Sequence, residues 1–174
     1  ALMAISKFVL KTLDGISRPA IAGLMPSLKG EIVILDLGAN VDCSSINLVQ
    51  FAIMGEVFSR SLLSIINPKV GILNVGSEEI KGNAIVKQTF EDLENLYPKI
   101  NFFGFIEGND INKGIVDVVV TDGFSGNIAL KTAEGVAQLI VSFLKNAYSS
   151  SFLAKVGYIL SRPALNRFKA IIDP

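Results

Sequence analysis

Apolar, strand-like runs alternate along this chain with amphipathic, helix-like segments, and this alternation limits the possible folds more than any other feature. Runs such as "IVIL" at residues 32–35 and "VVV" at residues 118–120 place apolar side chains on both faces of a strand. A strand of this kind needs cover on both sides, which helices provide when they connect parallel strands. The sequence therefore predicts an α/β fold with a largely parallel sheet covered by helices.

The expected elements follow from these runs and from the turn residues that bound them. Strands are predicted at residues 31–38, 69–76, 100–108 and 114–123. Helices are predicted from Ser44 or Ser45 to about Ile66, over residues 83–96 and over residues 125–147. An earlier helix, ending at Gly15, is expected from the spacing of Leu2, Ile5, Val9, Leu10 and Leu13. The short run "AIAGLMP" after Arg18-Pro19 is assigned to no regular element.

The end of the chain differs from the rest in charge. Residues 140–174 contain five Lys or Arg residues against a single Asp, and three consecutive serines at 149–151 indicate a turn between helices. Two helical segments are predicted after this turn, one before and one after Pro163. We therefore expect an α/β core at residues 1–148, and a basic, aromatic-bearing helical extension of the same domain at residues 149–174 that completes a hairpin.

Composition excludes several functional classes. The 174 residues suit one domain, and the balance of 16 Lys/Arg against 16 Asp/Glu argues against nucleic acid as a partner. No apolar run approaches the roughly 18 residues that a membrane span needs. Because the chain has no histidine, it cannot supply a serine–histidine or cysteine–histidine pair. The single cysteine, Cys43, is typical of a reducing compartment and is most simply a small buried hydrophobe.

Three segments share one design, in which a strand ends, a glycine follows, and polar residues lead into a helix. They are "LDLGANVD" at residues 35–42, "LNVGSEEIKGNA" at residues 73–84 and "VTDGFSGNIALKT" at residues 120–132. In a parallel sheet the carboxyl ends of the strands lie at one edge, so these loops should converge. Glycine allows close approach of the backbone, and a helix N-terminus offers N–H groups and partial positive charge. The pattern predicts a site for an anion such as phosphate.

Lys81 is the candidate cation of this site, and the alternative is a solvated lysine paired with Glu78 or Glu79. Likewise, "DGFSGN" is either an anion-binding turn or an ordinary strand-to-helix turn capped by Ser125. Asp36 and Asp122 could orient Lys81 or a loop amide, or cap helices. Neither GxxxxGK[ST] nor GxGxxG occurs, so nucleotide binding has no support from a motif. Adjacent carboxylates alone are a weak metal signal, and we predict neither a metal nor a cofactor.

Six blocks in order resemble the phosphate acyltransferases of bacterial phospholipid synthesis: "LDLGANVDC", "QFAIMGEVFSR", "NPKVGILNVGSEEIKGN", "FFGFIEGNDI", "VDVVVTDGFSGNIALKTAEG" and "RPALNRFKAIID". The resemblance covers essentially the whole chain. It implies a three-layer α/β/α homodimer related in fold to isocitrate/isopropylmalate dehydrogenases and phosphotransacetylases. It also implies further glycine-rich blocks before Ala1 and after Pro174, so that this chain would be a fragment.

The resemblance further implies transfer of a fatty acyl group from acyl carrier protein to inorganic phosphate, giving acyl phosphate. On matching positions it makes Lys81 and Asn127 catalytic. It makes Gly38, Asn40, Gly76, Gly82, Asn83, Gly123 and Gly126 the residues that shape the phosphate or substrate site, and the loop pattern adds Asp122 and Ser125 as binding residues. Ile80 departs from the family, whose loop often has a second glycine there. Phosphate is itself a nucleophile, so this reaction needs positioning and oxyanion stabilisation, and no histidine.

The basic hairpin fits an acidic carrier protein, the anionic membrane surface or a dimer partner. The residues expected on this surface are Lys145, Phe152, Lys155, Arg162, Arg167 and Lys169. The expected location is the cytoplasm, with the inner face of the membrane as a peripheral contact. Two other functions stay open: acyl transfer from coenzyme A, as in phosphotransacetylases, and a non-catalytic module that binds phosphate or acyl groups.

Overall fold

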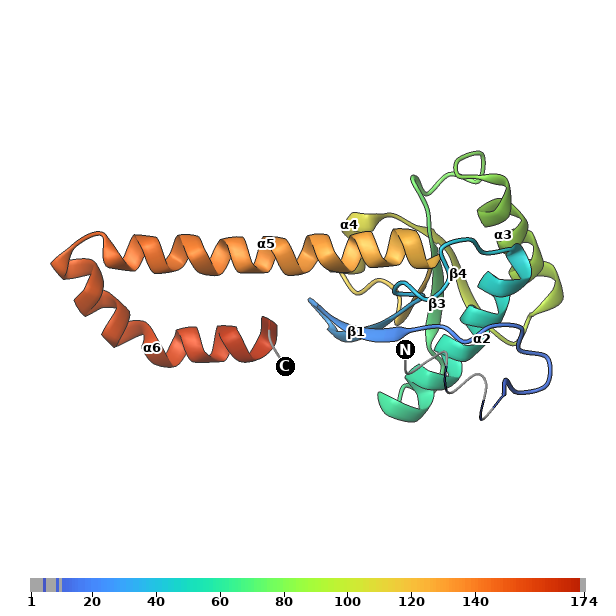
Figure 1. The fold of residues 1–174 in the computed structure, drawn as a ribbon, viewed down its shortest axis with the longest axis horizontal. Helices are drawn as coiled ribbons and strands as arrows, with labels where there is room; N and C mark the ends of the chain where they lie inside the picture. Colours follow the sequence, from blue (N-terminus) through green and yellow to red (C-terminus); the bar gives the residue numbers. More distant parts are fainter. Residues whose placement is uncertain (1–4, 6–8, 10, 173–174) are drawn as a thin grey trace. The chain divides into compact units, whose positions relative to one another are not determined.

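The computed structural model describes residues 5, 9 and 11–172 of the chain (Figure 1). The chain divides into two compact units, residues 1–128 and residues 129–174. Most of the predicted first helix, including Leu2 and Leu10, lies outside the described residues. Its predicted end is wrong, because Lys11 has a φ of 62°, which does not continue a helix, and Leu13 is not helical.

The first unit is built on a five-stranded sheet with the order β1-β2-β5-β3-β4. The strands are β1 (Ala22–Ser27), β2 (Gly30–Leu35), β3 (Lys69–Leu73), β4 (Asn101–Ile106) and β5 (Val118–Val120). β2, β5, β3 and β4 pair in parallel, which confirms the predicted α/β fold with a largely parallel sheet. The four predicted strands are all present, but each ends before the glycine-containing loop that follows it.

The edge strand β1 was not predicted from the sequence. It pairs antiparallel with β2, from Ala22 opposite Leu35 to Ser27 opposite Gly30, through a tight turn. Gly23 and Pro26 lower its β-propensity, and only Met25 is buried, so the run lacks the signal of a central strand. Proline is tolerated here because an edge strand leaves one row of N–H groups outside the ladder.

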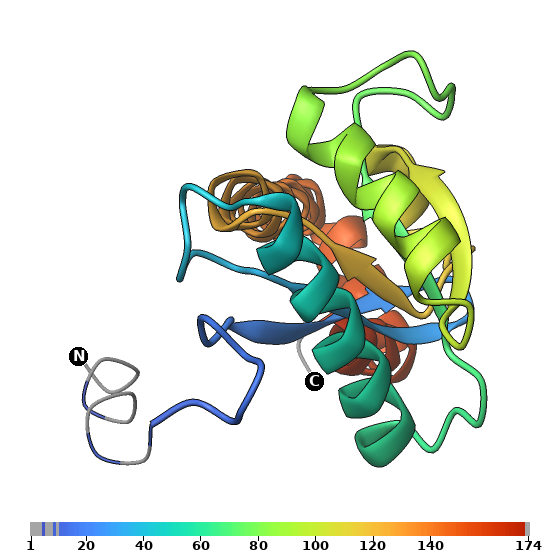
Figure 2. The ribbon, with the colours of Figure 1, turned by 90° about the vertical axis from the view of Figure 1, so that its right-hand side faces the viewer.

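Two helices, α2 (Ser45–Leu62) and α3 (Ala84–Leu96), cover one face of the sheet (Figure 2). The core between them contains Val33, Leu35, Val70, Ile72, Val118 and Val120 from the strands, with Leu48, Phe51, Ala52, Val86 and Leu93 from the helices. α2 ends four residues before its predicted end at Ile66. Ser64 has a φ of 57°, which stops the helix.

The opposite face of the sheet is also apolar and buried. Ile34, Val119 and Ile106 are fully buried there. The short helix α4 (Gly108–Ile111) contributes the buried Ile111, and Val116 packs against this face beside Ile106. Burial of the strands on both faces is the pattern from which the fold was predicted.

The second unit contains most of α5 (Gly123–Ser149) together with α6 (Phe152–Ile172). The serines at 149–151 form the predicted turn, and Ser151 Oγ accepts a hydrogen bond from the Ala154 amide at 3.1 Å. The Tyr148 and Tyr158 rings stack edge to face, with centroids 5.4 Å apart. The predicted break at Pro163 is wrong. α6 continues through it, because the carbonyl that Pro163 leaves without an N–H partner belongs to Ile159, which is exposed, so that solvent can hydrate it.

A prediction follows from Gly55, where α2 crosses the sheet. A Cβ atom added there would lie 2.5 Å from Val118 Cγ1 and 2.7 Å from Leu35 Cδ2. We expect Gly55→Ala to lower the free energy of unfolding by about 1–3 kcal/mol because the helix has to move outward. Urea unfolding followed by circular dichroism measures this effect.

The matched control is Gly135→Ala in α5, where an added Cβ meets no atom within 4 Å. Alanine should stabilise that helix by about 0.5–1 kcal/mol. Equal effects of the two substitutions would contradict the close contact of α2 with the sheet.

Candidate functional site

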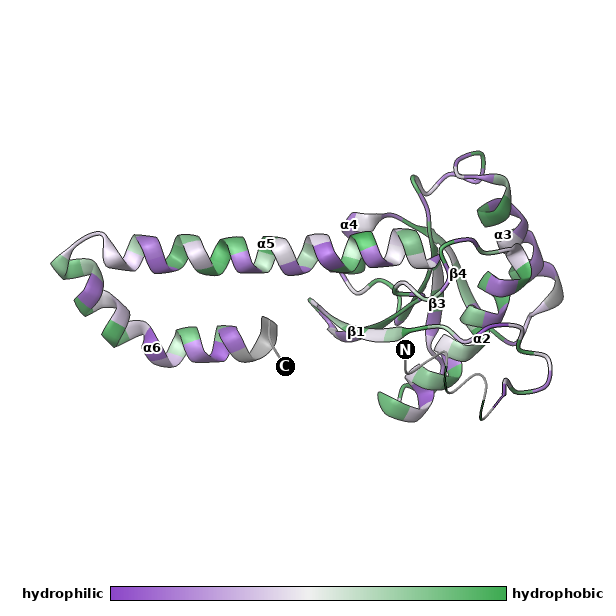
Figure 3. Ribbon diagram, viewed as in Figure 1, coloured by the Kyte–Doolittle hydropathy of each residue, from purple (hydrophilic) through white to green (hydrophobic). Residues whose placement is uncertain are grey.

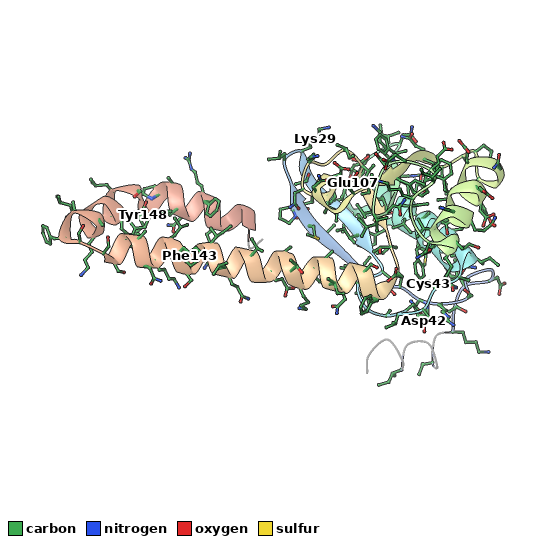
Figure 4. All side chains as sticks on the ribbon, turned by 90° about the horizontal axis from the view of Figure 1, so that it is seen from above. Lys29, Asp42, Cys43, Glu107, Phe143 and Tyr148 are labelled. Carbon is green, nitrogen blue, oxygen red and sulfur yellow. The ribbon has the colours of Figure 1, made fainter. Side chains whose placement is uncertain are left out.

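The carboxyl ends of β2, β5 and β3 lie at one edge of the sheet, where each strand leads through a loop into a helix. β2 leads into α2, β5 into α5 and β3 into α3. A cavity of about 490 Å³ opens at this edge, lined by Val41, Asp42, Cys43, Leu48, Asn83, Ile85, Val86, Asp122, Phe124 and Ser125. Asp42 and Cys43 are labelled in Figure 4, beside the beginning of α5. All three loops predicted to converge therefore border one cavity.

The first loop is held by the carboxylate of Asp36, which is fully buried. Its Oδ1 accepts hydrogen bonds from the backbone amides of Ile21 at 2.9 Å and Ala39 at 3.1 Å. Its Oδ2 accepts from the backbone amide of Asn40 at 2.6 Å and from Asn40 Nδ2 at 2.8 Å. Four donors replace the water that this charge has lost, which makes its burial possible. The loop is thereby fixed against the segment that precedes β1.

The predicted binding residue Asn40 is part of this network. Its side chain is buried, and Nδ2 donates to the Pro19 carbonyl at 2.8 Å as well as to Asp36. Its backbone carbonyl accepts a hydrogen bond from the Gly123 amide at 2.7 Å, which joins the first loop to the third. In this structure Asn40 positions both loops, and its amide nitrogen already has two acceptors.

Gly123 and Gly126 allow the first and third loops to touch. A Cβ atom at Gly123 would lie 2.8 Å from the Asn40 carbonyl oxygen, and one at Gly126 would overlap the Asp36 carbonyl oxygen. Both glycines are buried. Their lack of a side chain therefore serves close packing of backbone on backbone here.

The first turn of α5 is capped by Asp122. Its Oδ1 accepts from the Ser125 amide at 2.7 Å, and its Oδ2 accepts from Ser125 Oγ at 3.0 Å. The segment "DGFSGN" therefore forms the capped strand-to-helix turn that was the alternative from the sequence. The capping residue is Asp122, and Ser125 is the donor to it. Gly123, Ser125 and Gly126 all donate their amides within the protein, to the Asn40 carbonyl, to Asp122 Oδ1 and to the Asp122 carbonyl.

The second loop is organised by Asn74, a residue absent from the predicted set. Its Nδ2 donates to the carbonyls of Gly76 at 3.0 Å and Lys81 at 3.2 Å. Gly82 has a φ of +91° and lies against the Asn74 side chain. Asn83 caps α3, since its Oδ1 accepts from the Val86 amide at 2.9 Å. The sequence signal for Asn74 is its place directly after β3, where loop residues carry function in parallel sheets.

Of the two predicted catalytic residues, neither lines the cavity. Lys81 Nζ lies 3.2 Å from Glu78 Oε1 on an exposed loop, so Lys81 is the solvated lysine paired with Glu78 that the sequence allowed as the alternative. Its aliphatic stem packs over Gly76. Hydrogen bonds from its own backbone amide and from Lys81 lower the pKa of Glu78. Asn127 lies beside Gly38, whose added Cβ would be 3.6 Å from the Asn127 side chain. The structure therefore brings together Gly38 with Asn127, and Gly76 with Lys81.

Partial positive charges from the backbone and full negative charges from side chains both border the cavity. The N-termini of three helices border it and contribute partial positive charge. Its charged lining residues are the carboxylates of Asp42 and Asp122. Burial raises the pKa of the Cys43 thiol, and the nearby carboxylates add to this shift. Within the part of the chain that is described, no group of three or more acidic or cysteine residues is placed to hold a metal ion.

The second unit contains the predicted partner surface. Lys145, Phe152, Lys155, Arg162, Arg167 and Lys169 are all exposed. Apolar and polar residues alternate along both helices (Figure 3), and Phe143, labelled in Figure 4, is 62% exposed. A groove between α5 and α6 is lined by aromatic and aliphatic side chains together with polar ones, including Glu134, Lys145 and Lys169. Among the described residues, every helix falls short of the length or the hydropathy that a membrane span requires.

Comparison with known proteins gives one consistent result. Residues 1–174 match the profile of a family described as "Fatty acid synthesis protein". The chain is 59% identical over 174 residues to a protein named phosphate acyltransferase from Paramagnetospirillum magneticum, and 57% identical to one from Rhodospirillum rubrum. These alignments cover 100% of this chain and 50% of each relative. The chain spans about half the length of the curated relatives it matches.

The Asp36 network yields a prediction about stability. Asp36→Asn replaces one carboxylate oxygen by an NH₂ group, which leaves two N–H donors without an acceptor. We expect the free energy of unfolding to fall by at least about 2 kcal/mol, measured by urea denaturation. Asp42→Asn, which changes an exposed acid six residues away, should change stability by less than about 0.5 kcal/mol. An Asp36→Asn variant as stable as the parent would contradict the role of the carboxylate as the acceptor of these four hydrogen bonds.

Proposed function

Because this chain belongs to the fatty acid synthesis protein family, we propose that it carries part of the active site of an enzyme that transfers an acyl group to inorganic phosphate. The observation that supports this most is the meeting of three strand-to-helix loops around one cavity. Open α/β sheets bind their ligands at this edge, and the partial positive charge of three helix N-termini favours an anionic reactant at the edge, beside the cavity. The relatives named phosphate acyltransferase identify the reaction class that we assign.

The proposed reaction needs no protein nucleophile. An oxygen of phosphate bonds to the carbonyl carbon of an acyl thioester, and negative charge gathers on the carbonyl oxygen. The C–S bond then breaks, the hydrogen phosphate gives up its proton to solvent, and the departing thiolate takes one up, so that acyl phosphate and free thiol are formed. Positioning of the two reactants lowers the barrier by roughly 7–11 kcal/mol, and one hydrogen-bond donor to the oxyanion by about 3–4 kcal/mol.

We assign Lys81 to the phosphate and Asn127 to the oxyanion. Lys81 lies on an exposed loop in an ion pair with Glu78, and exposed pairs are worth only about 0–1 kcal/mol. A phosphate dianion can therefore displace Glu78 at little cost. The amide of Asn127 lies beside the exposed backbone of Gly38, where a substrate can approach closely. Asn74 acts as a positioning residue, because it holds the Lys81 carbonyl.

The finer proposal concerns the donor and the partners. We propose that the acyl group arrives on acyl carrier protein, and that the acyl phosphate enters phospholipid synthesis. The exposed cations of the second unit support this, since an acidic carrier protein complements a basic helical surface. We also propose a cytoplasmic homodimer, with peripheral contact between the helical hairpin and the membrane or a membrane-bound acyltransferase.

A prediction about Lys81 tests the assignment of roles. In the full-length protein that contains this sequence, Lys81→Ala should lower the rate of acyl phosphate formation at least 100-fold. Its unfolding midpoint should stay unchanged, because the ammonium is exposed. The matched control is Lys131→Ala, which removes another exposed ion pair, with Glu134 at 2.8 Å. Near-normal turnover in Lys81→Ala would remove this lysine from the mechanism.

A prediction about Phe152 separates the partners of the hairpin. Phe152 is 80% exposed at the start of α6. If this end of the hairpin contacts lipid, Phe152→Glu should abolish flotation of the full-length protein with anionic liposomes, since a charge replaces an apolar anchor. Leu28→Glu, at an equally exposed position in the first unit, should leave flotation intact. Unchanged flotation of Phe152→Glu would exclude Phe152 as a lipid contact.

A further inference from the structure

The polar side chains that line the sheet-edge cavity are largely engaged within the protein. Both carboxylate oxygens of Asp122 accept hydrogen bonds from Ser125, and Asn83 Oδ1 accepts from the Val86 amide. The other six lining residues apart from Asp42 are apolar or weakly polar: Val41, Cys43, Leu48, Ile85, Val86 and Phe124. Slightly more than half of the surface that the cavity offers to a ligand is apolar, and most of its polar atoms already have partners within the protein.

Three of these side chains stand at the mouth of the cavity. Val41 is 60% exposed, Ile85 is 41% exposed and Phe124 is 58% exposed. They come from three separate segments, the loop before α2, the first turn of α3 and the first turn of α5. Leu48 and Val86 lie deeper and are almost fully buried. A single exposed apolar residue is ordinary, but three from separate segments that line one cavity together with the buried Leu48 and Val86 favour an apolar ligand.

Charge argues against phosphate as the occupant of this cavity. Its charged lining residues, Asp42 and Asp122, are both acids. Phosphate carries about two negative charges near neutral pH, so it would be repelled by both carboxylates. A neutral hydrocarbon chain meets no such penalty. Lys81, the proposed phosphate ligand, lies two residues before Asn83 in the chain and is not among the residues that line the cavity.

We propose that this cavity holds the acyl chain of the thioester donor, with Val41, Ile85 and Phe124 as the residues that select its length, while phosphate binds outside it near Lys81. This inference rests on the proposed acyl transfer to phosphate. It divides the sheet edge into an apolar compartment for the chain and a polar compartment for the nucleophile. Each CH₂ group buried in the cavity should raise affinity by about fourfold until the cavity is full.

Cys43 reports on occupancy without any need for turnover, because its thiol lines the same cavity. The full-length protein is treated with N-ethylmaleimide, and the peptide that contains Cys43 is quantified by mass spectrometry. Inorganic phosphate and a series of alkyl phosphates, from ethyl to hexadecyl, are added below their micelle-forming concentrations. We expect hexadecyl phosphate to slow the alkylation of Cys43 at least tenfold and octyl phosphate to slow it less. Ethyl phosphate and inorganic phosphate should leave the rate unchanged.

Substitution of an apolar residue that lines the cavity tests whether its side chain contacts the bound chain. Phe124→Ala should raise the hexadecyl phosphate concentration that gives half-protection at least fivefold, since it removes apolar contact with the chain. Leu28→Ala removes an apolar side chain that is 87% exposed on the β1–β2 turn, away from the cavity, and should leave this concentration unchanged. An equal effect of the two variants would overturn the assignment of Phe124.

The other outcomes separate this inference from the proposed function. Protection by inorganic phosphate equal to that by hexadecyl phosphate would overturn the inference, because the cavity would then be an anion site. A Cys43 that reacts only after unfolding would also overturn it, because a cavity that a small maleimide cannot enter cannot admit a hydrocarbon chain. If the protein forms acyl phosphate but no alkyl phosphate protects Cys43 from alkylation, the proposed function stands and the inference about the cavity is wrong. Chain-length-dependent protection without acyl phosphate formation supports the cavity assignment and removes the proposed reaction.

Discussion

The buried carboxylate of Asp36 is the interaction on which the candidate site depends. An ionised group in an apolar core is very costly unless hydrogen-bond donors surround it, and Asp36 has four. These bonds give residues 36–40 one conformation. The Asn40 carbonyl can then accept the Gly123 amide, and Gly126 can pack against the Asp36 carbonyl. Through these contacts one carboxylate aligns the loops after β2 and β5, and with them the first turns of α2 and α5.

The same edge combines two kinds of electrostatic character. Helix N-termini supply partial positive charge from the backbone, while Asp42 and Asp122 supply full negative charges inside the cavity. The lysine assigned to phosphate lies on a neighbouring exposed loop, held by the Asn74 amide through its carbonyl. Such a separation suits a reaction between a charged nucleophile and a neutral, apolar substrate. The acidic cavity disfavours the nucleophile, and the exposed polar loop of Lys81 disfavours the apolar chain.

Much of the fold was readable from the sequence because it follows from local patterns. Continuous apolar strands such as "IVIL" require two covering layers, and the glycines after them mark where strands end. The elements that were missed depend on tertiary context. β1 contains Gly23 and Pro26 and becomes a strand only by pairing with β2, while α6 passes through Pro163 because that turn is exposed. α2 ends early because the backbone of Ser64 is left-handed, and a serine at this position does not by itself predict that conformation.

For the site, the sequence predicted which loops would meet but not how. Parallel topology alone brings them to one edge, whereas the partners of Gly126 and Asn40 are set by the fold. The account is tested most directly by phosphorus NMR on the full-length protein mixed with inorganic phosphate and a long-chain acyl thioester of acyl carrier protein. It predicts an acyl phosphate signal that grows in step with the release of free thiol. Thiol release that yields free fatty acid without acyl phosphate, or no reaction at all, would contradict it.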